Sequence, residues 1–138
     1  MKLHDLHLSV ADVKALSAML AAHRRGQTLE ADPAEALAQL MAQARHLPAE
    51  ALSADRVAMG STVTYVEEPA GVRRTVTLAY PADADFASGR ISVLSPVGRS
   101  LLGRKRGDIV DVVLPGRRLL EIHIVRTVRD ADALLKAA

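Results

Sequence analysis

The sequence of 138 residues predicts an α+β fold in which helices come first and strands follow. Before about residue 50, apolar residues recur at the three- and four-residue spacing of a helix. After residue 55, β-branched and apolar residues alternate with polar ones, which is typical of strands. We therefore expect an antiparallel helical hairpin, in effect a short coiled coil, over residues 1–50. A β-sheet domain with one short helix is expected over residues 51–138.

The first helix is expected to begin at Ser9 and to end near Arg25. The Ser9 hydroxyl can accept a hydrogen bond from a free N–H of the first turn, and Asp12 suits the positive end of the helix dipole. Gly26 is expected just past the end, where a left-handed conformation is needed. The apolar stripe consists of Val10, Val13, Leu16, Met19 and Leu20. A helix of about 17 residues is roughly 25 Å long at 1.5 Å per residue.

The second helix is expected from Asp32 to His46. Asp32 caps it and Pro33 occupies its first position, where the missing N–H costs nothing. Pro48 ends it. Its apolar stripe consists of Leu37, Leu40, Met41, Ala44 and Leu47. A short polar link between two such stripes is typical of an antiparallel helical hairpin.

Strands are expected where the apolar alternation has a period of two. The turns between them are marked by Pro and Gly at 69–71 and 115–116. The expected strands are residues 62–67, 74–80, 91–94, 109–114 and 118–127.

Residues 95–108, SPVGRSLLGRKRGD, allow two interpretations. The five-residue spacing of Gly98 and Gly103 is close to that of a phosphate-binding loop. That loop requires a lysine, a hydroxyl residue and a following helix, whereas here Arg104 follows the glycine and a strand comes next. A short helix accounts for more residues, since Ser95 can cap it and Pro96 can begin it.

The same segment supplies the rest of the expected short helix and a basic cluster. Leu101 and Leu102 are expected to be buried, Gly103 to end the helix, and Gly107 with Asp108 to turn the chain into the next strand. The short helix and the turn do not account for the four basic residues of the segment, which are Arg99, Arg104, Lys105 and Arg106.

Composition argues against several kinds of function. The net charge of +2 and pI near 9.3 permit an acidic partner without requiring one. With one Phe, two Tyr and no Trp, the chain has few of the aromatic platforms on which nucleic-acid bases stack. There is no cysteine, and no acidic set completes a metal site with any histidine. The N-terminal segment has no long apolar run, so we expect a soluble, cytoplasmic protein without a membrane span.

The motifs of the second half resemble a known family. They are Ile91–Pro96 (ISVLSP), Leu101–Gly103 (LLG), Gly107–Asp108 and Pro115–Gly116. In this order they resemble the C-terminal domain of the Gre transcript-cleavage factors, whose fold is similar to that of FKBP prolyl isomerases. The segments TLAYPADAD at 77–85 and LSPVG at 94–98 further resemble one branch of the family, the regulators of nucleoside diphosphate kinase (Rnk). The resemblance covers about residues 57–128.

The resemblance implies a non-enzymatic protein that docks on bacterial RNA polymerase at the rim of the secondary channel and contacts DNA only through the polymerase. The grip would come from the loop before the short helix, and the basic cluster would steer the approach. The implied polymerase-binding residues are Leu94, Ser95, Pro96, Val97, Arg99, Arg104, Lys105 and Arg106. No catalytic residue, metal or cofactor is expected, and any effect on nucleoside diphosphate kinase would be indirect.

The tip of the helical hairpin bears on whether the protein stimulates RNA cleavage. Cleavage factors carry two acidic residues on an arm about twice as long, where they help to hold a catalytic magnesium. Here the tip carries Arg24, Arg25, Glu30 and Asp32, and Asp32 with Glu35 fits the start of a helix. We therefore expect competition with cleavage factors without cleavage. Two alternatives stay open: a module acting directly on nucleoside diphosphate kinase, and a prolyl isomerase, whose aromatic-lined pocket this composition scarcely supplies.

Overall fold

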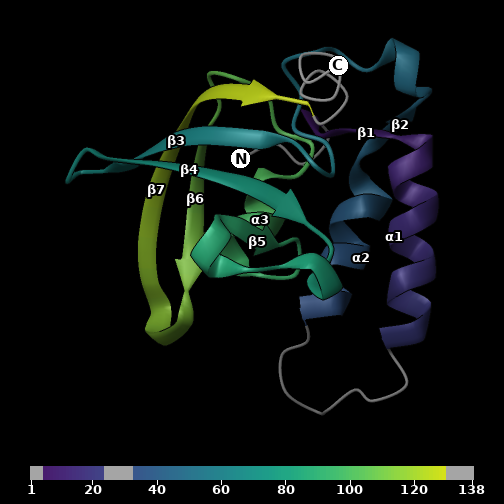
Figure 1. Cartoon of the computed structure of the whole chain (residues 1–138), viewed down its shortest axis with the longest axis horizontal. Helices are drawn as coiled ribbons and strands as arrows, with labels where there is room; N and C mark the ends of the chain where they lie inside the picture. The colour runs from purple at the N-terminus through teal and green to yellow at the C-terminus, as the bar shows by residue number, and fades with distance from the viewer. Residues whose placement is uncertain (1–4, 24–32, 130–138) are drawn as a thin grey trace.

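The computed structural model describes residues 5–23 and 33–129, and it confirms the α+β class (Figure 1). Helices α1 (Val10–His23) and α2 (Pro33–Gln43) lie side by side at one end of a curled sheet. The sheet is five-stranded with the order β5-β4-β3-β7-β6. Its strands are β3 (Thr62–Glu68), β4 (Val72–Ala79), β5 (Arg90–Ser92), β6 (Ile109–Leu114) and β7 (Arg118–Val128). These strands match the five that the sequence predicts to within two residues at most ends.

Short helices occupy the connections. The α-helix α3 (Pro96–Leu101) follows β5, and single 3₁₀ turns lie at η3 (Ala49–Ala51), η4 (Pro81–Asp83), η5 (Phe86–Ser88) and η6 (Pro115–Arg117). Strand β3 is central: it pairs antiparallel with β4 on one side and with β7 on the other. A register shift between Thr64 and Tyr65 marks a bulge in the β3–β7 ladder, and bulges bend and twist a sheet locally. The curl leaves a concave face.

A small parallel sheet, which the sequence does not predict, closes the base of the helical hairpin. It pairs β1 (His7–Ser9) with β2 (Arg45–Leu47). The predicted second helix is wrong at its end, because α2 stops at Gln43 and His46 lies in β2. The reason is non-local: Arg45 N–H donates to the Leu6 carbonyl at 2.8 Å, so pairing with the N-terminal segment replaces the last helical turn.

The hairpin and the sheet share one hydrophobic core. Buried residues of the hairpin, such as Leu16 and Leu37, belong to the same cluster as Val63 and Ile122 of the sheet. At the base, His7 N–H donates to the Gly103 carbonyl at 3.2 Å. The hairpin is therefore anchored to the segment that follows α3.

Asp12 links α1 to the sheet domain at a second point. The Ser9 Oγ accepts from Asp12 N–H at 3.0 Å, which confirms the predicted cap. The Asp12 carboxylate accepts from Met59 N–H, also at 3.0 Å, in the loop that leads to β3. Burial raises the pKa of the Asp12 carboxyl, because desolvation disfavours its charged form.

The raised pKa of Asp12 predicts a pH dependence of stability. A carboxyl that holds its proton more tightly in the folded state contributes most below the ordinary aspartate pKa of about 3.9, and that contribution is lost as the pH rises through the raised value. An asparagine side chain at this position would keep an acceptor for Met59 N–H without titrating. We expect the unfolding free energy of the wild type to fall relative to that of Asp12→Asn between about pH 3 and about pH 7 in urea titrations. A difference that stays constant, or grows, over this range would contradict the assignment.

Candidate functional site

The loop before α3 is held by a side-chain cap. The Ser95 Oγ accepts from Gly98 N–H at 3.1 Å and donates to the Ser92 carbonyl at 2.7 Å. Pro96 takes the first helical position, as predicted. Leu101 and Leu102 are fully buried, and Gly103 has φ +81°, so the capped short helix is confirmed.

Gly98 brings α3 against β5 at a distance that no other residue allows. A Cβ built at position 98 would lie 2.1 Å from the Ser92 carbonyl oxygen and 2.9 Å from Ser95 Oγ. The backbone of the helix therefore touches the end of β5 directly. This contact fixes where residues 95–97 sit relative to the sheet.

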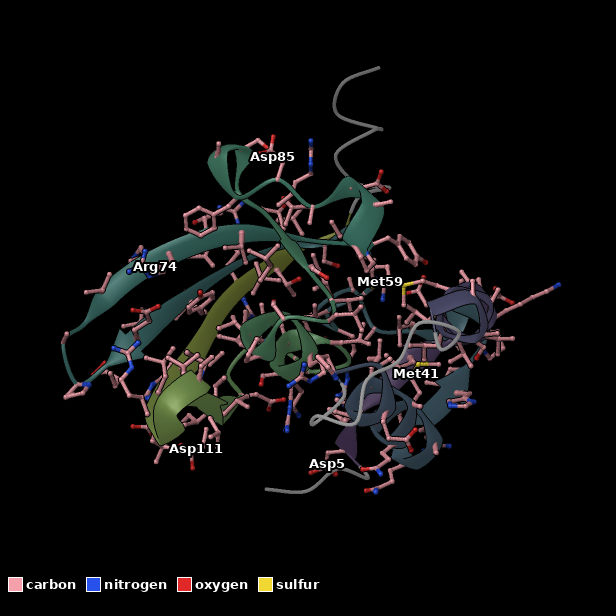
Figure 2. All side chains as sticks on the ribbon, turned by 90° about the horizontal axis from the view of Figure 1, so that it is seen from below. Asp5, Met41, Met59, Arg74, Asp85 and Asp111 are labelled. Atoms are coloured by element: carbon pink, nitrogen blue, oxygen red, sulfur yellow. The ribbon has the colours of Figure 1, made fainter. Side chains whose placement is uncertain are left out.

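Residues 95–97 form part of the lip of an open groove of about 700 Å³. The groove lies on the concave face, between the start of α3, the loop before β5 and the outer half of the β3–β4 hairpin. Figure 2 shows Arg74 and Asp85, which line the groove, on the side of the molecule away from Met41 of α2. Its larger apolar lining residues are Tyr65, Val76, Phe86, Ile91, Pro96, Val97, Leu114 and Leu120. The volume is in the range of ligand and peptide sites.

Charged side chains line the other part of the groove. Arg74 Nε donates to Glu67 Oε2 at 2.7 Å, so this pair is largely neutralised. Arg90 and Asp85 are only loosely paired, with 3.9 Å between Nη2 and Oδ2. Arg73 also lines the groove and is exposed. The wall thus has an excess of positive charge.

The structure divides the residues that the resemblance implies. Ser95, Pro96 and Val97 line the groove together. Leu94 precedes them, half-buried, and its carbonyl oxygen accepts a hydrogen bond from Arg99 Nη1. Burial lowers the pKa of the Arg99 guanidinium. The Arg99 side chain therefore braces the loop through this hydrogen bond.

The predicted basic cluster is not one exposed surface. Arg104 is buried, with 7% of its surface exposed, and desolvation lowers its pKa while the charges of Asp108 and Asp5 raise it. The expectation that Arg104 steers a partner is therefore corrected. Lys105 and Arg106 are exposed, but neither lines the groove.

Other predicted features lie outside the site. The hairpin-tip residues Arg24, Arg25, Glu30 and Asp32 lie outside the described residues. Within residues 5–23 and 33–129, no group of three or more His, Asp or Glu residues could hold a metal ion. No helix in the same ranges is long and apolar enough to cross a membrane.

The sequence interpretation missed most of the groove. It expected too few aromatic residues for an apolar pocket, yet Tyr65 and Phe86 both line the groove. The period of two does place Tyr65 on the inner face, because Val63 and Tyr65 are both buried. Nothing in the sequence shows that the loop carrying Phe86 folds over that face.

Comparisons with known proteins agree with the motifs. The family model described as transcription elongation factor, GreA/GreB, C-terminal, matches residues 52–127. A transcription elongation factor GreA from Mesorhizobium japonicum is 36% identical over 95 residues, which are 69% of this chain and 60% of that protein. GreA from Nitratidesulfovibrio vulgaris is 43% identical over 79 residues, which are 57% of this chain and 49% of that protein. This chain therefore spans about half to three fifths of the length of these relatives.

A solved structure extends the likeness to nearly the whole chain. The prokaryotic transcription elongation factor GreA/GreB from Nitrosomonas europaea superimposes with a TM-score of 0.70 at 31% identity. The match covers 89% of this chain and 97% of that one, so it includes the helical hairpin as well as the sheet.

Proposed function

Because the chain belongs to the GreA/GreB family of transcription elongation factors, we propose that it is a transcription regulator that binds bacterial RNA polymerase at the rim of the secondary channel. The observation that carries the proposal is the placement of Ser95, Pro96 and Val97 at the lip of an open, largely apolar groove. The cap and the tight contact at Gly98 fix this lip before a partner arrives. A preorganised surface loses little conformational entropy on binding. In this role the protein works in the cytoplasm.

The regulator does not itself stimulate RNA cleavage in this proposal. The whole hairpin from Val10 to Gln43 has 34 residues. Two arms of about 17 residues each are roughly 25 Å long at 1.5 Å per residue, which is short for an arm that must carry carboxylates to the polymerase active centre. Occupying the rim without reaching the active centre would make the protein a competitor of cleavage factors. Residues 77–85 and the LSPVG segment support the narrower assignment to the Rnk branch, with an effect on nucleoside diphosphate kinase that runs through transcription.

A competition experiment tests this function. Backtracked complexes of purified polymerase are given a fixed amount of GreA and increasing amounts of this protein. We expect RNA cleavage to fall as the protein is added, and no cleavage with the protein alone. The Pro96→Glu variant should compete at least about tenfold less well, since a charge then stands at the lip of an apolar groove. The new glutamate suits the first turn of α3, so stability should be preserved.

The control is Leu119→Glu, which places the same charge on the other face of the sheet. Leu119 is exposed, and its neighbour Leu120 lines the groove, so the two side chains point to opposite faces. This variant should compete as the wild type does. Equal competition by Pro96→Glu and wild type would refute docking through the groove. Robust cleavage by the protein alone would refute the non-cleaving role. A pull-down with purified nucleoside diphosphate kinase in place of polymerase should be negative.

A further inference from the structure

Phe86 has an exposure that folding does not explain. Its side chain is 88% exposed, whereas Tyr65 is 3% exposed and Tyr80 is packed against the core. These are the only aromatic residues of the chain. An exposed phenylalanine forgoes the burial that stabilises a large apolar side chain. The ring is therefore free to contact something other than this chain.

The loop that carries Phe86 is held in one conformation by its own backbone and polar side chains. Asp85 and Arg90 form a two-way bridge, with N–H to carbonyl distances of 2.9 Å and 3.0 Å. The Asp85 carboxylate accepts from Ala87 N–H at 3.2 Å and caps η5. Gly89, at φ +81°, closes the turn by donating to the Phe86 carbonyl at 3.0 Å. These hydrogen bonds fix the backbone that carries the exposed Phe86 ring.

The ring stands at a position where a partner would meet it together with the lip. Phe86 lines the groove, as do Pro96 and Val97 on α3. Arg90, the first residue of β5, and Arg73, from β4, line the same groove. Among the described residues Arg73 has no ion-pair partner within 4.0 Å. A groove that carries an exposed apolar side chain and an unneutralised guanidinium fits a surface with an apolar socket and carboxylates at its edge.

We propose that Phe86 is an anchor residue that inserts into an apolar socket on the partner protein, and that Arg73 pairs with an acidic residue at the rim of that socket. The inference rests on the proposed function, because the partner is the polymerase segment that occupies the groove. Aromatic side chains are enriched at the cores of protein interfaces, where a few anchor residues carry most of the binding energy. A segment of the partner occupies the groove, and Phe86 inserts into a socket on the partner. Specificity then comes from two complementary fits instead of one.

The test is a titration of labelled protein with purified core polymerase. Phe86→Ala is expected to weaken binding by at least about tenfold, and Phe86→Leu to restore part of the loss. Arg73→Glu should weaken binding at low salt and less so at high salt, because rim charges are screened. The thermal midpoint of Phe86→Ala should match that of the wild type, since an exposed ring contributes little to folding.

A matched control is Val113→Ala, which truncates an apolar side chain that is 63% exposed on β6 and does not line the groove. It should bind as the wild type does. If Phe86→Ala also binds as the wild type while Pro96→Glu does not, the anchor is wrong and the docking function stands. If wild-type protein fails to bind polymerase, the docking function itself is wrong and the anchor falls with it. A lowered melting temperature in Phe86→Ala would make the residue structural and would also overturn the anchor.

Discussion

Gly98→Ala is expected to lower the free energy of unfolding by about 3 kcal/mol, with the loss of polymerase binding in the same variant. The added Cβ would lie 2.1 Å from the Ser92 carbonyl oxygen and 3.0 Å from its carbonyl carbon. Both are backbone atoms, so no rotamer change relieves the overlap. Either α3 moves away from β5 or the end of β5 deforms. Both movements displace Pro96 and Val97 from the lip of the groove.

The measurement is urea denaturation followed by circular dichroism, together with the polymerase titration. Gly107→Ala is the matched control: its φ is +95°, and a Cβ there would have nothing within 4 Å. That variant carries only the strain of a left-handed alanine, about 1–2 kcal/mol, and it leaves the groove intact. It should therefore bind polymerase as the wild type does. Equal destabilisation by the two substitutions would show that steric overlap at Gly98 is not what matters.

The short helix shows what local signals in a sequence can predict. Ser95, Pro96 and Gly103 each have a conformational preference that acts within one or two turns, so the cap, the start and the end of α3 follow from the sequence. The sequence does not indicate why position 98 is a glycine, because its only notable feature there is the phosphate-loop spacing to Gly103. Its actual role is the close approach of two segments, and that depends on tertiary packing.

The hairpin base shows why other elements could not be predicted. Residues 45–47 continue the helical stripe of α2 in the sequence, yet they pair with residues 7–9, nearly forty positions away. Strand pairs as short as these leave no periodicity to detect. The groove has the same difficulty, because Tyr65, Phe86, Pro96 and Leu120 come from four separate segments. Each residue is ordinary on its own, and only the curl of the sheet brings them together.

The basic residues illustrate a related limit. A run of Arg and Lys after Gly103 suggests a surface patch, since such residues are rarely buried without partners. In the structure Arg99 braces its own loop and Arg104 is buried. Arg56, which the sequence interpretation did not single out, is 8% exposed. The composition gives the number of charged residues. Which guanidinium groups are buried depends on the tertiary fold, because a buried arginine needs backbone carbonyl oxygens to accept its hydrogen bonds.

Arg56→Met is expected to lower the free energy of unfolding by about 3 kcal/mol. The Arg56 Nη1 donates to the Asp5 carbonyl at 2.6 Å and to the Gly103 carbonyl at 3.0 Å. The guanidinium therefore joins the segment before β1 to the end of α3. Methionine preserves much of the alkyl volume but leaves both carbonyl oxygens without this donor. Hydrogen bonds from a charged donor contribute roughly 1.5–3 kcal/mol each. The Gly103 carbonyl keeps its hydrogen bond from His7 N–H, so we expect the loss to lie at the lower end of the sum for two such bonds.

Local opening distinguishes this role from a general loss of charge. The His7 amide donates to the Gly103 carbonyl, so its hydrogen exchange should accelerate in Arg56→Met more than exchange in β3, where Val63 is fully buried. Arg106→Met removes an equal charge from an exposed neighbour and should change stability by less than about 0.5 kcal/mol. The loss of unfolding free energy in Arg56→Lys should lie between the losses in these two variants. An ammonium group keeps the charge but lacks the planar set of donors of a guanidinium. If Arg56→Met is no more destabilising than Arg106→Met, the hairpin is not held to the sheet domain by Arg56. The shared core and the hydrogen bonds of His7 and Asp12 then hold it.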